Sequence, residues 1–263
     1  MRYQVRLLAV VAAATLIQLA ATPASAVVIS FATFSDTASN LRWVNSDGAA
    51  DTGSGGSLFS ITTPSSAGVG STSVNFSFIN VGIAADVTNV TASFRLNASA
   101  PTGNPATTVG PFLKQGGIGG SFSFITTSAI FIPSTGTFYA AGSNLLSGTF
   151  GGASILALGA GGIFGAATSA GDTLVLTSDF LDFAATTDRS MDLSLGGVSP
   201  GSSSLSSATA LRGFTGTGQG AFSYDAPDPS GAIPEPSTWG LMILGFGVLG
   251  ARLRRRRSGM VTA

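Results

Sequence analysis

The sequence has no cysteine and no histidine in 263 residues. Without cysteine there can be no disulfide, so a folded domain has to rely on its apolar core alone. The absence of histidine excludes Ser-His-Asp and Cys-His catalysis and the usual zinc ligands, and it leaves no side chain that ordinarily titrates near neutral pH. The sequence therefore gives no indication of a cofactor.

Charge is also scarce, at 9% of residues, and the stretch 115–171 has no acidic or basic residue. The formal net charge of zero hides an uneven distribution, because most basic residues lie near the two ends. Between Val27 and Ile233 there are five basic residues against eleven aspartates, a net charge of about −6. A region of this charge lacks the basic surface that nucleic acid or anionic lipid requires, so we expect no nucleic-acid partner.

The first 26 residues have the three parts of a secretory signal peptide. Arg2 and Arg6 supply the positive charge, residues 7–21 are apolar, and Ala24 and Ala26 form an A-x-A cleavage site. We expect signal peptidase to cut after Ala26, so that the mature chain begins at Val27.

The C-terminal region combines a proline motif, an apolar run and a basic cluster. The motif is Pro234, Glu235, Pro236 and Trp239, the apolar run is residues 240–251, and the cluster is Arg252, Arg254, Arg255, Arg256 and Arg257. Arginines directly behind an apolar run stop a translocating chain with its basic end in the cytoplasm. As a helix, the run would measure roughly 20 Å against a hydrocarbon core of about 30 Å, so we expect one short transmembrane helix that anchors weakly.

This order of motif, helix and arginines resembles the PEP-CTERM sorting signal, in the subtype with Trp three residues after the second Pro. The resemblance covers residues 234–257, with Gly240 where that subtype usually has Ala. It implies a Gram-negative host that makes exopolysaccharide, export through the inner membrane, and processing by an exosortase. The protein would be membrane-anchored before processing and at the cell surface or extracellular after it.

The region between the two signals shows the period-two pattern of β-strands. Residues 74–78, 91–96, 121–124 and 173–177 alternate or cluster β-formers, and turn-rich stretches such as 45–56 and 97–110 separate them. This predicts a mainly β, antiparallel β-sandwich or jelly-roll-like exported domain over 27–224. A linker rich in Pro, Asp and Gly follows at 225–233, then the sorting signal at 234–257 and a short tail at 258–263.

Residues 149–167 are apolar enough to suggest a second membrane span. Their many glycines and weak helix propensity favour buried strands in a glycine-rich sheet instead. We therefore expect strands here.

Candidate chemistry is sparse and centres on four aspartates: Asp179, Asp182, Asp188 and Asp192. They are weak candidates for a calcium site, because their spacing matches no defined calcium loop and solvated turn aspartates are the plainer explanation. A glycosidase would need two acidic groups about 5 to 9.5 Å apart, and these aspartates are the densest group available. We predict no catalytic residue.

The sequence favours a non-enzymatic surface or extracellular-matrix protein associated with exopolysaccharide or biofilm. Its expected partners are signal peptidase, an exosortase, the membrane through the C-terminal helix, and exopolysaccharide. A carbohydrate-active enzyme is one alternative, and an adhesin or ice-binding-like β protein with a regular Thr array is another.

Overall fold

The structure is a computed structural model that describes residues 28–36, 38–204 and 206–225. This part of the chain is almost entirely β, with two short 3-10 turns at Gly48–Ala50 and Thr168–Ala170. Among the described residues, no helix has the length and apolar character to cross a bilayer. The predicted signal peptide, the sorting signal and the short tail lie outside these residues.

Fourteen strands make up the described chain. In chain order they are β1 Val28–Ser35, β2 Leu41–Asn45, β3 Gly56–Ser60, β4 Thr72–Phe78, β5 Val90–Ala100, β6 Thr107–Val109, β7 Phe112–Thr126, β8 Ile130–Ile132, β9 Thr137–Tyr139, β10 Asn144–Leu158, β11 Gly161–Ala167, β12 Thr173–Thr177, β13 Thr187–Ser199 and β14 Phe214–Asp225.

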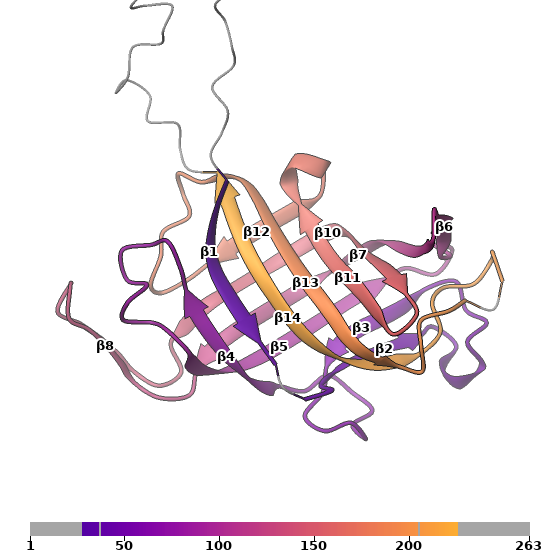
Figure 1. Ribbon diagram of the computed structural model, residues 1–263, viewed down its shortest axis with the longest axis horizontal. Helices are drawn as coiled ribbons and strands as arrows, with labels where there is room; N and C mark the ends of the chain where they lie inside the picture. Colours follow the sequence, from indigo (N-terminus) through magenta and orange to yellow (C-terminus); the bar gives the residue numbers. More distant parts are fainter. Residues whose placement is uncertain (1–27, 37, 205, 226–263) are drawn as a thin grey trace, which may run out of the picture. The chain divides into compact units, whose positions relative to one another are not determined.

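All strand pairs are antiparallel, and the main sheet closes on itself. The circuit runs β1–β4–β5–β7–β10–β11–β13–β14 and returns from β14 to β1. Figure 1 shows this sheet as two layers: β1, β14, β13 and β11 lie in front, and β5, β7 and β10 cross behind them. The predicted mainly β, antiparallel fold is therefore confirmed, and its two sandwich-like layers belong to one continuous sheet.

Three further strands, β2, β3 and β12, pair with parts of the circuit strands that their neighbours in the circuit leave free. The hairpin β2–β3 bridges the start of β14 and the second half of β5, with β2 pairing β14 and β3 pairing β5. Strand β12 pairs with β10 beside β11. Strands β8 and β9 form a separate two-stranded sheet.

Alternation in the sequence sets which side chains face the interior. In β5, the side chains of Ala92, Phe94, Leu96 and Ala98 are buried, whereas the polar residues between them face outward. Because successive residues of a strand point to opposite faces, an alternating sequence gives one apolar and one polar face. The outer surface of the sheet is consequently rich in Ser, Thr and Asn.

Phenylalanine rings fill the space between the layers. Phe94 stacks on Phe124 at 4.6 Å between ring centroids, and Phe34 approaches Phe124 at 4.8 Å. A void next to Phe34 and Phe222 measures about 10 Å³, which is at the lower limit for a single water molecule. This interior is packed, so a ligand site has to be sought on the outer surface.

Strand β14 presents glycines to the interior, at Gly216, Gly218 and Gly220. A Cβ atom at Gly218 would lie 2.4 Å from Leu41 Cδ1, and one at Gly220 would lie 2.6 Å from Phe34 Cε1. Glycine lets these large side chains pack directly against the backbone of β14. The position of Phe34 against the backbone of β14 at Gly220 depends on this close approach.

Residues 149–167 fold as the second part of β10 and all of β11. Phe150, Ile155 and Phe164 are buried, and glycines lie between them. This confirms the expected strands in a glycine-rich sheet.

The segment before β14 is fixed to the end of the sheet by polar contacts. Trp43, which is fully buried, donates a hydrogen bond from Nε1 to the carbonyl oxygen of Leu211 at 2.9 Å. The Asp51 carboxylate pairs with Arg212 Nε at 3.3 Å and accepts a hydrogen bond from the backbone N–H of Gly213 at 2.8 Å. These contacts hold the crossing from β13 to β14 in place and have a structural role.

Candidate functional site

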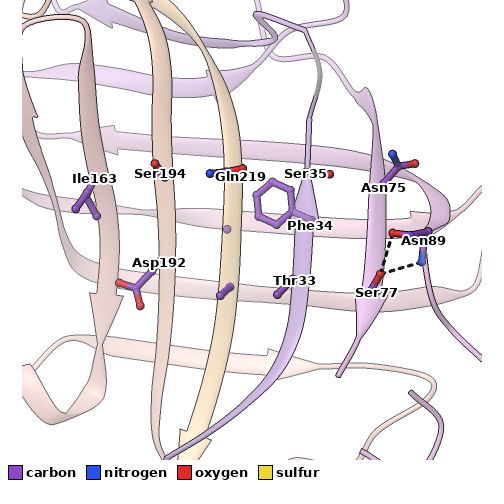
Figure 2. A pocket seen from close by; sticks show the side chains of 12 residues that line it. Thr33, Phe34, Ser35, Asn75, Ser77, Asn89, Ile163, Asp192, Ser194 and Gln219 are labelled. Carbon is purple, nitrogen blue, oxygen red and sulfur yellow. Dashed lines mark hydrogen bonds between the residues drawn. The ribbon is translucent and has the colours of Figure 1, made fainter. Parts of the chain in front are cut away.

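The outer face of the front layer is hollowed into an open groove of about 620 Å³. Figure 2 shows that its lining side chains come from β1, β4, β11, β13 and β14 and from the turn that precedes β5. The residues that line it are Thr33, Phe34, Ser35, Asn75, Ser77, Asn89, Ile163, Asp192, Ser194, Gln219, Gly220 and Ala221.

Most lining side chains are uncharged hydrogen-bonding groups at outward positions of strands. Hydroxyl groups can donate and accept, and the amides of Asn and Gln do both at fixed positions. Ser77 and Asn89 are held together, since the Asn89 backbone N–H donates to Ser77 Oγ at 2.8 Å and Ser77 Oγ donates to Asn89 Oδ1 at 3.5 Å. The dashed lines in Figure 2 mark these two contacts.

A small residue on β14 leaves room for the hollow. Ala221, at an outward position of the strand, has only a methyl group, whereas Gln219 stands at the rim. Phe34, whose side chain is 6% exposed, packs under Gly220 and forms part of the floor. The groove thus has an apolar floor and a polar rim.

Asp192 is the one ionisable side chain of the lining. On β13 it pairs with Ala221 of β14 on one side and with Gly165 of β11 on the other. Partial burial between these strands raises the pKa of the Asp192 carboxyl above its usual value. The groove therefore holds a single carboxyl group, which keeps its proton to a higher pH than a solvent-exposed aspartate does.

The other predicted aspartates lie apart from the groove lining. Asp179 accepts a hydrogen bond from the backbone N–H of Asn144 at 2.7 Å, and Asp182 accepts one from Ala184 at 2.9 Å. Asp188 lies near the start of β13 in the left-handed region, with φ 39°. Within the described part of the chain, no three acidic side chains come together in a way that could hold a metal ion.

The arrangement of the groove suits binding more directly than hydrolysis. Glycoside hydrolysis in its common forms uses two carboxyl groups on either side of the scissile bond. The groove lining contributes one, Asp192, and no Trp or Tyr that could stack against a sugar ring. What the lining does offer is a set of hydroxyl and amide groups around a partly apolar floor.

Sequence reasoning singled out Asp192 only as a weak calcium candidate, and it missed the rest of the groove. Thr33, Asn75, Ile163 and Gln219 come from four strands that are distant in the chain. Alternation marks each as an outward position, but only the pairing register shows that they face one hollow.

The remaining predicted site residues lie outside the described residues. They are the cleavage residues Ala24 and Ala26, the motif Pro234, Glu235, Pro236 and Trp239, and the arginines Arg252, Arg254, Arg255, Arg256 and Arg257.

Comparison with known proteins bears on this terminal region. Neither the curated proteins nor the solved structures include a match to the chain. One family model matches, at residues 232–257, and it is described as the PEP-CTERM protein-sorting motif. Such a motif indicates an exported protein whose C-terminal region is processed by an exosortase. The chain thus carries a PEP-CTERM sorting signal, as its Pro-Glu-Pro motif, apolar run and arginine cluster predict.

Proposed function

We propose that this is a non-enzymatic surface or extracellular-matrix protein that binds a neutral exopolysaccharide in the groove of its exported β domain. In this proposal the N-terminal signal peptide exports the chain, the sorting signal holds it for exosortase processing, and the groove supplies the contact with the surrounding matrix. The observation that carries the proposal is the groove lining, in which uncharged hydroxyl and amide groups surround a partly apolar floor.

The lining matches the chemistry of a neutral sugar chain. Sugar hydroxyls donate and accept hydrogen bonds, and the amides of Asn75 and Gln219 can do both with one ligand group. The apolar C–H faces of a sugar ring fit against Ile163 and Ala221. The groove is open to solvent, which suits a polymer that continues beyond the site.

Charge favours a neutral polysaccharide over an anionic one. Asp192 is the sole charged group of the lining, and it is acidic. The exported region also has an excess of aspartates over basic residues. A carboxylated or sulfated polymer would be repelled, and no lining arginine or lysine would offset this repulsion.

The proposal is tested by titrating residues 27–225 with the neutral exopolysaccharide of the producing bacterium. The described residues of this span form a compact unit with its own core. We expect Asn75→Ala combined with Gln219→Ala to weaken binding roughly 5- to 150-fold, because two hydrogen bonds contribute about 0.5–1.5 kcal/mol each.

A matched control is Asn97→Ala, which removes an exposed amide from β5 in the other layer. It should leave the affinity unchanged. Equal binding by the wild type and the double variant would contradict the groove as the site.

Sizing the polysaccharide after incubation separates this proposal from a carbohydrate-active enzyme. A binding protein leaves the chain-length distribution unchanged. Shortening that is lost in Asp192→Asn would establish a hydrolase and overturn the non-enzymatic assignment.

A further inference from the structure

The hairpin β8–β9 exposes two phenylalanines to solvent. Phe131 is 56% exposed and Phe138 is 66% exposed, and the two residues are direct partners in the hairpin. Ile130 and Ile132 point to the opposite face, where they are buried. Figure 1 shows the hairpin projecting from the two layers at the left. One face of the hairpin is therefore anchored in the core, and the other presents two adjacent aromatic rings.

The connection that contains this hairpin has no charged residue. From Thr127 to Ser143 its side chains are apolar or neutral. Two large exposed rings in an uncharged projection are unusual on a soluble surface, because most exposed apolar residues occur singly. Such a projection is suited to an apolar environment.

Strand directions place the hairpin at the end of the sheet where the chain enters and leaves the domain. Strand β1 starts at Val28, directly opposite Asp225 at the end of β14. Following the antiparallel circuit, β4 ends and β5 starts at this same end. Strand β7 also ends here, with Thr126 opposite Ala92, and the hairpin follows it.

Aromatic contacts join the hairpin base to the end of β14. Tyr139 of β9 stacks on Phe180 at 3.9 Å between ring centroids. Phe183, in the same connection as Phe180, approaches Tyr224 of β14 at 6.4 Å. The hairpin is thus held in a fixed place relative to the residue from which the chain continues to its sorting signal.

We infer that Phe131 and Phe138 insert into the interface of the bilayer on which the unprocessed chain is anchored. The inference rests on the C-terminal membrane anchor that accompanies the proposed function. Residues 226–239 separate β14 from the apolar run, and even fully extended they reach on the order of 45 Å. The anchored domain therefore stays close to the membrane surface, where aromatic side chains partition favourably.

The charged groups at this end favour a zwitterionic surface over an anionic one. Asp86 lies beside the tip of the hairpin. Its carboxylate accepts a hydrogen bond from Ser134 of the hairpin turn at 3.2 Å. Asp179, Asp182 and Asp188 also lie in or beside the connections at this end, with Arg189 as a cation. Insertion is thus apolar in origin, and anionic lipid should weaken it.

Site-directed spin labelling tests the inference cleanly, because the chain has no cysteine. Phe138→Cys in the full chain is labelled with a nitroxide and reconstituted in phosphatidylcholine vesicles. The control label is at Thr149→Cys, an exposed position on β10. We expect oxygen to relax the label at position 138 far more than a water-soluble nickel complex does, and the reverse at position 149.

Further labels separate the possible failures. A label at Thr238→Cys, beside the apolar run, reports the anchor itself. An inserted label at 238 with a water-exposed label at 138 would overturn the inference and leave the anchor intact, whereas two water-exposed labels would refute the anchor as well. Spin–spin broadening at 138 that disappears on dilution with unlabelled chain would show that a second copy covers the rings, and it too would overturn the inference.

Two additional measurements make the expectation specific. A label at Thr135→Cys, an exposed position in the hairpin turn, should be inserted in the otherwise unchanged chain and water-exposed when both rings are replaced, as Phe131→Ser with Phe138→Ser. Vesicles that contain phosphatidylglycerol should shift the label at 138 toward water. Unchanged insertion in the first measurement would contradict a role for the rings.

Discussion

Replacing Gly220 with alanine tests the close packing that shapes the groove. An added Cβ would lie 2.6 Å from the backbone oxygen of Asp192 and 2.6 Å from Phe34 Cε1. The oxygen belongs to the β13–β14 pairing and cannot withdraw, and the Phe34 ring is held by Phe94 and Phe124. Overpacking of this kind typically costs about 1–3 kcal/mol.

A smaller effect opposes this cost. Alanine reduces the conformational freedom of the unfolded chain relative to glycine and so stabilises by about 0.4–1 kcal/mol where the native backbone tolerates it. We therefore expect Gly220→Ala to lower the free energy of unfolding by about 1–2 kcal/mol. The added methyl group also displaces Phe34, which forms part of the groove floor, so Gly220→Ala should weaken polysaccharide binding as well.

The measurement is urea unfolding of residues 27–225, followed by the fluorescence of Trp43, the only tryptophan in this span. The matched control is Gly82→Ala, because a Cβ at Gly82 meets nothing within 4 Å. Gly82→Ala should be neutral or slightly stabilising. If Gly220→Ala is as stable as Gly82→Ala and binds polysaccharide equally well, the packing argument is refuted.

Three further predictions concern other parts of the chain. Because burial raises the pKa of Asp192 above the usual 3.8, the folded state holds this proton more tightly than the unfolded state. Stability contributed by the group is therefore lost as the pH rises from below 3.8 through the raised pKa of the folded state, and chemical denaturation should show a smaller loss over this range in Asp192→Asn. Trp43→Phe leaves the buried carbonyl of Leu211 without one of its two hydrogen-bond donors. It should therefore lower the free energy of unfolding by about 1–3 kcal/mol, as measured by circular dichroism during denaturation. An unchanged unfolding midpoint would show that the remaining hydrogen bond from Asn45 suffices. Deletion of Pro234–Pro236 should abolish exosortase processing, which mass spectrometry and surface labelling of whole cells detect; unchanged mass and display would contradict the sorting function.

Period-two alternation predicted strands wherever large apolar residues mark the inner face. Residues 74–78, 121–124 and 173–177 fall within β4, β7 and β12 for this reason. The turn-rich interpretation of 97–110 was wrong at both ends, since β5 continues to Ala100 and β6 occupies 107–109. The inner residues there, such as Ala98, are too small to produce a clear hydrophobic signal.

The closure of the sheet and the groove could not be predicted from local pattern. Both depend on long-range register, such as the pairing of Val28 with Asp225 across nearly the whole domain. Asp192 was identified from the density of aspartates, but its neighbours Gly165 and Ala221 are set by pairing alone. The sorting signal was predictable because its information lies in contiguous sequence.

The most direct test of groove binding is a nitrogen–proton NMR titration of residues 27–225 with short fragments of the neutral exopolysaccharide. The side-chain amides of Asn75 and Gln219 report on the groove, and that of Asn97 reports on the opposite layer. Groove binding predicts saturable shifts of the Asn75 and Gln219 resonances with Asn97 unmoved. Saturable shifts confined to Asn97, or no shift at either face, would contradict it.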